Sequence, residues 1–141
     1  MEVIYKRCCG IDVHKMKLVA CLKKGNRQEI KEFGAETKDI KEMADWLLAE
    51  KCEMIAMEST ASYWKPLVNI FETKCLDFII INAKEYKNVP GRKTDVADSE
   101  WIADLLRHGL LKEVIFQIVI KENLEKLLDI EKVLLKKELE L

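Results

Sequence analysis

Four acidic residues stand where their side chains can serve chemistry: Asp12, Glu58, Asp95 and Asp98. At helical spacing, Asp95 and Asp98 fall on one side of a helix expected over residues 94–108, where they continue an apolar stripe. Such a stripe faces a core, and an ionised carboxylate is almost never buried unless it is paired or binds a metal. The spacing therefore predicts a cation, or a charged partner, beside this helix.

Carboxylates that converge on one place repel one another, and divalent cations resolve that repulsion. Hard oxygen ligands suit Mg²⁺ or Mn²⁺. Two such ions about 3.5–4 Å apart can clamp a phosphodiester, activating the attacking oxygen and steadying the leaving one. If the four acids converge, the pattern predicts metal-dependent phosphodiester chemistry.

The elements around these acids indicate an α/β domain with a mixed sheet and flanking helices. Strands are predicted first as a hairpin and an edge strand, and then as two short buried strands, each preceded by a helix. Thr37 is expected to be the N-cap of the first of these helices. In order, the predicted strands cover residues 7–13, 17–22, 27–33, 54–57 and 76–81, and the two helices between them cover 37–51 and 64–74.

Asp12 and Glu58 each stand at the end of a predicted strand. In sheets of this kind the functional crevice lies beyond the carboxyl ends of the parallel strands. If the first strand is central, the two acids are neighbours, and the helix with Asp95 and Asp98 can pack across them. Gly10, on the same face as Asp12, leaves space for a ligand or another backbone to come close.

Each acid also has a purely structural interpretation. Asp95 can N-cap its helix, and Asp98 in the first turn suits the helix dipole. Asp12 can be a turn residue, and Glu58 can cap the turn that follows its strand. The four together, each at the end of an element, favour the metal site over these alternatives.

The predicted loop at residues 83–93 is basic. It carries four cationic side chains against Glu85 alone, with Tyr86 among them, and is either an ordinary solvated loop or a set of phosphate contacts. The chain as a whole has a net charge of -1, which is unusual for a protein that binds nucleic acid unaided. The predicted nucleic-acid-binding residues are Lys84, Lys87, Arg92 and Lys93.

The composition bounds the class of protein. A chain of 141 residues has room for one domain and an appendage, which we expect to be a domain at 1–115 and a Leu-, Lys- and Glu-rich helical tail at 116–141. Without an apolar run of about 20 residues or a signal-peptide core, we expect a cytoplasmic protein that does not contact a membrane. The five cysteines contain no C-x-x-C pair, and buried free thiols are expected rather than a zinc site.

Four motifs carry a resemblance. The stretches at residues 10–15 (GIDVHK), 57–64 (MESTASYW), 93–98 (KTDVAD) and 105–111 (LLRHGLL) resemble, in order and spacing, the N-terminal domain of the DEDD transposases of the IS-one-ten insertion-sequence family. The resemblance covers about residues 7–112. It implies a resolvase-like domain of the ribonuclease-H-like fold that holds Mg²⁺ on an acidic tetrad, here Asp12, Glu58, Asp95 and Asp98. It also implies target DNA, a structured guide RNA and a homo-oligomeric assembly as partners.

The chain departs from the family after residue 115. Family members continue into a second domain that supplies a serine nucleophile, and Ser59, Ser62 and Ser99 do not correspond to it. We therefore expect a truncated transposase that folds but cannot complete strand exchange alone. The alternative is a catalytically silent remnant that binds nucleic acid or intact transposase subunits. Sugar-kinase-like ATPases begin with a similar strand, but the single scattered glycines argue against their phosphate loops.

Overall fold

The computed structural model describes most of the chain in four long stretches and a few residues near its end. The described residues are 2–58, 62–82, 86–92, 96–111, 132, 133, 135 and 136. The predicted tail at 116–141 lies outside them, apart from the last four residues named, which have helical backbone.

One mixed sheet of five strands forms the centre of the molecule, in the order β3-β2-β1-β4-β5. The strands β1, β2 and β3 are joined by antiparallel pairing, whereas β1, β4 and β5 run parallel. The first strand is therefore central, as the proximity of Asp12 to Glu58 requires. The strand bounds are β1 Arg7–Val13, β2 Lys17–Lys24, β3 Arg27–Gly34, β4 Met54–Glu58 and β5 Phe78–Ile81.

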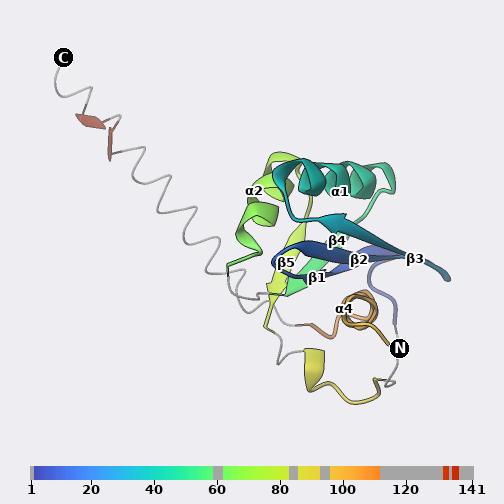
Figure 1. Cartoon of the computed structure of the whole chain (residues 1–141). Coiled ribbons are helices and arrows are strands. Elements are labelled where there is room, and N and C mark those ends of the chain that lie inside the picture. Colours follow the sequence, from blue (N-terminus) through green and yellow to red (C-terminus); the bar gives the residue numbers. More distant parts are fainter. Residues whose placement is uncertain are drawn as a thin grey trace.

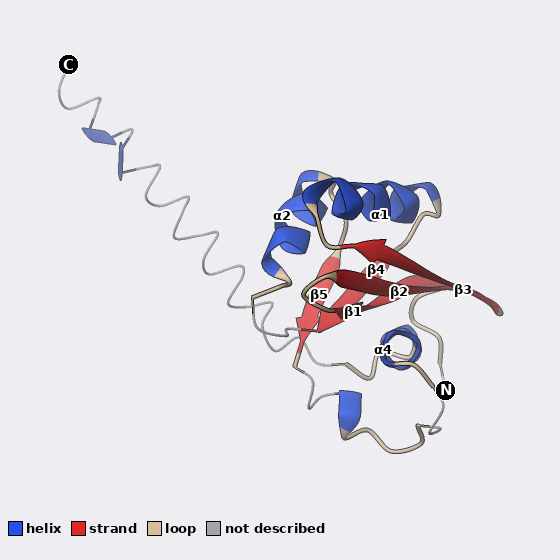
Figure 2. Ribbon diagram, viewed as in Figure 1, coloured by secondary structure: helices blue, strands red, loops and turns tan. Residues whose placement is uncertain are grey.

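Helices cover the two faces of this sheet unequally (Figure 1 and Figure 2). The helices α1 (Thr37–Ala49) and α2 (Lys65–Thr73) lie together on one face. The helix α4 (Asp98–Arg107) lies on the other face, below β1 in the view of Figure 1. None of the helices in the described part of the chain is long and apolar enough to span a membrane.

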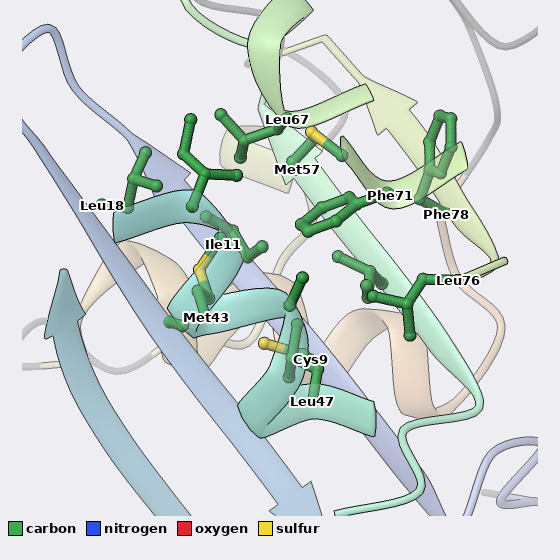
Figure 3. Packing of buried hydrophobic residues seen from close by; sticks show 14 of the residues in the cluster. Cys9, Ile11, Leu18, Met43, Leu47, Met57, Leu67, Phe71, Leu76 and Phe78 are labelled. Carbon is green, nitrogen blue, oxygen red and sulfur yellow. The ribbon is translucent and has the colours of Figure 1, made fainter. Parts of the chain in front are cut away.

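The alternation of side chains along β1 divides the core into two clusters. Cys9, Ile11 and Val13 belong to the larger cluster under α1 and α2, part of which is drawn in Figure 3. Cys8 belongs to the smaller cluster under α4. All five cysteines are free, and three of them are buried, whereas Cys52 is half-buried and Cys75 is exposed.

One predicted N-cap and one predicted helix start were wrong. The N-cap of α1 is Glu36, not Thr37, and its backbone N–H donates to the carboxylate of Asp39 at 3.2 Å. The acidic helix starts at Asp98 instead of near residue 94, because Ala97, its N-cap, is extended (φ −63°, ψ 152°). The guanidinium of Arg92 donates to the carbonyl of Val96 at 2.6 Å, which holds this segment away from helical geometry.

Candidate functional site

Asp12 and Glu58 lie side by side at the carboxyl ends of two paired parallel strands. The last registered pair of β1 and β4 joins Ile11 to Met57, and each acid follows one residue later on its own strand. Because successive side chains alternate between faces, both carboxylates are on the face that α4 covers, opposite Ile11 and Met57. Glu58 is 9% exposed, and it is one of two buried polar residues in the described part of the chain.

Asp98 reaches the same place from the first turn of α4. The backbone of this helix lies directly against β1 at Gly10, where an added Cβ would overlap the carbonyl oxygen of Ser99 and the backbone of Ala103. The close approach predicted at Gly10 is therefore to another backbone. The first turn of the helix, which begins at Asp98, therefore lies against the strand that carries Asp12.

The electrostatics show that these three carboxylates interact. The pKa of Asp12 is raised above its ordinary value of 3.8, mainly because burial disfavours the charged form. Repulsion from Asp98 and Glu58 raises the same pKa further, and His14 opposes the shift. A cation placed among the three side chains would relieve both the desolvation and the repulsion.

Each carboxylate of the site also has its own protein partner. The Nε2 atom of His14, in the turn between β1 and β2, lies 3.0 Å from Oδ2 of Asp12. The hydroxyl of Tyr86 donates to Oε2 of Glu58 at 2.8 Å, and Nη2 of Arg92 donates to Oδ1 of Asp98 at 2.7 Å. The partners account for one oxygen of each carboxylate.

The chemistry of this donor set fits a hard divalent cation, because the donors are carboxylate oxygens that repel one another. As they stand, no three His, Cys, Asp or Glu side chains among the described residues are grouped to hold one ion. The fourth predicted ligand, Asp95, is outside the described residues. The prediction of a tetrad therefore remains a prediction, and its three described members lie where α4 covers the sheet.

The basic loop is described only in part. Lys84 and Lys93 lie outside the described residues. Lys87 is exposed, and its Nζ lies 5.7 Å from the ring centroid of Tyr86. Arg92 donates hydrogen bonds to the carboxylate of Asp98 and to the carbonyl of Val96, which the sequence pattern did not predict.

Two aromatic residues at this site also escaped sequence reasoning. Tyr86 was visible only as a lone aromatic in a basic loop, yet it is fully buried against Glu58. Trp101 is buried, and it donates its indole N–H to the carbonyl of Tyr86 at 2.7 Å. Tyr86 could have been noticed because it is an aromatic residue among polar side chains, only five residues after a buried strand.

The chain matches one family model over residues 9–136, and that model describes transposases of the DEDD type represented by the insertion sequence IS110. The chain belongs to this transposase family. The match confirms the resemblance carried by the four motifs and extends beyond residue 115. The comparison with curated proteins returned no significant match.

Solved structures place this transposase chain in the ribonuclease-H-like fold. It is similar to Thermus thermophilus RuvC in complex with a Holliday junction substrate, with a TM-score of 0.52 and 12% identity over 77% of this chain and 99% of that one. A second structure of Thermus thermophilus RuvC matches with a TM-score of 0.50 and 10% identity over the same shares of the two chains. At such identities the likeness shows the fold, and the fold class predicted from the sequence is confirmed.

Proposed function

We propose that this chain carries the metal-dependent phosphodiester-cleaving site of a DNA transposase. The observation that supports the proposal most is that Asp12, Glu58 and Asp98, from β1, β4 and α4, all lie where α4 packs on one face of a RuvC-like sheet in a transposase family member. Asp95 is proposed as the fourth ligand. The site would serve strand cleavage and transfer in DNA transposition.

Asp12, Glu58, Asp95 and Asp98 would hold Mg²⁺ or Mn²⁺. The bound ions would activate the attacking oxygen and neutralise charge on the leaving oxygen of a phosphodiester. Asp12 and Glu58 are fixed by the sheet at the ends of paired strands, so their separation is set by the register. Gly10 sets how closely Asp98 approaches them, because any side chain at position 10 would prevent α4 from lying so near to β1.

We further propose DNA as the substrate and phosphate contacts from Lys84, Lys87, Arg92 and Lys93 in the loop beside the acids. The similar RuvC structure is a complex with a Holliday junction, which makes branched DNA the first substrate to test. A net charge of -1 gives the chain little nonspecific attraction for DNA, so metal ions and further subunits would have to contribute. The guide RNA and the homo-oligomer implied by the family belong to this proposal.

A second candidate is a catalytically silent chain that binds nucleic acid or other transposase subunits. The engagement of Asp12, Glu58 and Asp98 by His14, Tyr86 and Arg92 favours it, because a carboxylate with a protein partner does not need a cation.

A calorimetric titration of the whole chain with Mn²⁺ distinguishes the two candidate functions. The variants are Asp12→Asn and Asp98→Ala, and the matched control is Asp104→Asn, on the same helix but paired with Lys23 at 3.5 Å. The proposal expects saturable binding that is lost in both variants and kept in the control. Absence of binding by a folded wild-type chain would support the silent chain instead.

A further inference from the structure

The side chain of Tyr86 is fully buried between the end of β4 and the helix α4. We propose that Tyr86 is the positioning residue that orients Glu58 for metal binding and couples it to Asp98. This inference rests on the proposed function and adds a residue outside the acidic tetrad. Two hydrogen bonds, one at each end of the Tyr86 residue, support it.

The first hydrogen bond selects one orientation of the Glu58 carboxylate. The Tyr86 hydroxyl donates to Oε2 at 2.8 Å, so this oxygen is engaged, whereas Oε1 accepts no hydrogen bond from the described residues and is left for a ligand. Ligating carboxylates are commonly oriented by such an outer hydrogen bond.

The second hydrogen bond ties Tyr86 to the helix that carries Asp98. The indole Nε1 of Trp101 donates to the backbone carbonyl of Tyr86 at 2.7 Å. Trp101 stands three residues after Asp98 on α4, within the same turn. Tyr86 and Trp101 also share the smaller hydrophobic cluster. A continuous path of hydrogen bonds and helix backbone therefore fixes Glu58 relative to Asp98.

A purely structural role is the competing interpretation. A buried carboxylate without a partner is costly, and Tyr86 would then only satisfy Glu58. Such a role changes the stability of the chain without metal but not its affinity for metal. A positioning role changes the affinity for metal as well, so measuring both quantities distinguishes the two.

The test is Tyr86→Phe in the whole chain, with Mn²⁺ affinity and the melting temperature without metal measured on the same samples. Tyr5→Phe is the matched control, because Tyr5 packs against the same cluster and loses the same atom. We expect Tyr86→Phe to weaken Mn²⁺ binding by about 10-fold or more, as for other groups that orient metal ligands. We expect Tyr5→Phe to leave the affinity unchanged.

Glu58→Gln tests whether Glu58 is a metal ligand at all, independently of the role of Tyr86. If the wild-type chain binds Mn²⁺ and Glu58→Gln abolishes binding while Tyr86→Phe binds normally, the positioning role is overturned and the metal site stands. If wild type and Glu58→Gln bind alike, both proposals are overturned. In the Glu58→Gln background, Tyr86→Phe should have no further effect on residual binding.

A second variant serves in case Tyr86→Phe does not fold. Trp101→Phe keeps an aromatic ring in the cluster but removes the indole N–H that holds the Tyr86 carbonyl. We expect a smaller loss of Mn²⁺ affinity than for Tyr86→Phe, with the hydroxyl still present. Unchanged affinity in a folded Trp101→Phe chain would overturn the coupling between Glu58 and Asp98.

Discussion

The two faces of the sheet differ in what they bury. Under α1 and α2 the buried side chains are apolar, Cys9, Phe71 and Ile80 among them. Under α4 the protein buries Glu58, Ser99 and the hydroxyl of Tyr86, and the Oγ atom of Ser99 has no hydrogen-bond partner among the described residues. Buried polar groups lower stability unless they are fully paired. The difference indicates that the face under α1 and α2 supplies most of the stability, whereas the polar groups of the candidate site lower the stability of the face under α4.

The largest loss of stability is expected from a substitution in the apolar cluster under α1 and α2. Phe71 on α2 is fully buried, and its ring centroid lies 6.2 Å from that of Phe78. Phe71→Ala should lower the free energy of unfolding by about 3–5 kcal/mol, because it leaves a cavity. Mn²⁺ affinity, measured where the chain is folded, should not change. A variant that lost both stability and metal binding would show that the faces are not independent.

A smaller loss of stability is expected where α4 meets β1. The side chain added by Gly10→Ala would overlap the α4 backbone, so the free energy of unfolding should fall by about 1–3 kcal/mol, and Mn²⁺ affinity should fall with it. The control is Gly25→Ala, whose Cβ meets nothing within 4 Å although its φ of +59° is unfavourable for alanine. Chemical denaturation and Mn²⁺ titration on both variants check this. Equal metal affinity in wild type and Gly10→Ala would contradict the role assigned to Gly10.

The ion pair of Arg92 with Asp98 should matter little to stability and more to metal binding. Both side chains are partly exposed, at 27% and 33%, so Arg92→Gln should change the free energy of unfolding by about 1 kcal/mol or less. Because the guanidinium competes with a cation for Asp98, Mn²⁺ binding without nucleic acid should become several-fold tighter. Lys87→Gln, in the same loop, is the control. Weaker binding by Arg92→Gln would show that the pair preorganises Asp98 instead.

The smallest expected effect on stability concerns Asp12 and depends on pH. Because the pKa of Asp12 is raised in the folded chain, the folded state binds more protons than the unfolded state at pH values between 3.8 and the raised pKa. The free energy of unfolding contributed by Asp12 therefore falls as the pH rises through that window. Metal-free Asp12→Asn should melt slightly above wild type at pH 7, and the difference should vanish below pH 3.8. Asp77→Asn, at an exposed aspartate, is the control.

Much of the fold was predictable because its signals are local. The alternation of Cys9, Ile11 and Val13 against Gly10 and Asp12 indicated a strand with two different faces, and the structure confirms it. The strand over residues 76–81 was predicted two residues too long at its start, because Leu76 is buried without being part of β5. The start of α4 was missed because the residue types around Ala97 do not reveal that its backbone is extended, next to the Val96 carbonyl to which Arg92 donates.

Residue types and their spacing were enough to indicate the side chains of the candidate site and the elements that carry them. Residue types and the periods of 2 and 3.6 residues are local properties, so Asp12, Glu58 and Asp98 and their elements could be named before any fold was known. Only the tertiary structure decided their partners. The contact of Tyr86 with Glu58 and that of α4 with Gly10 join segments far apart in the sequence, which the packing of the elements brings together. Such contacts depend on how whole elements dock, and no local pattern records them.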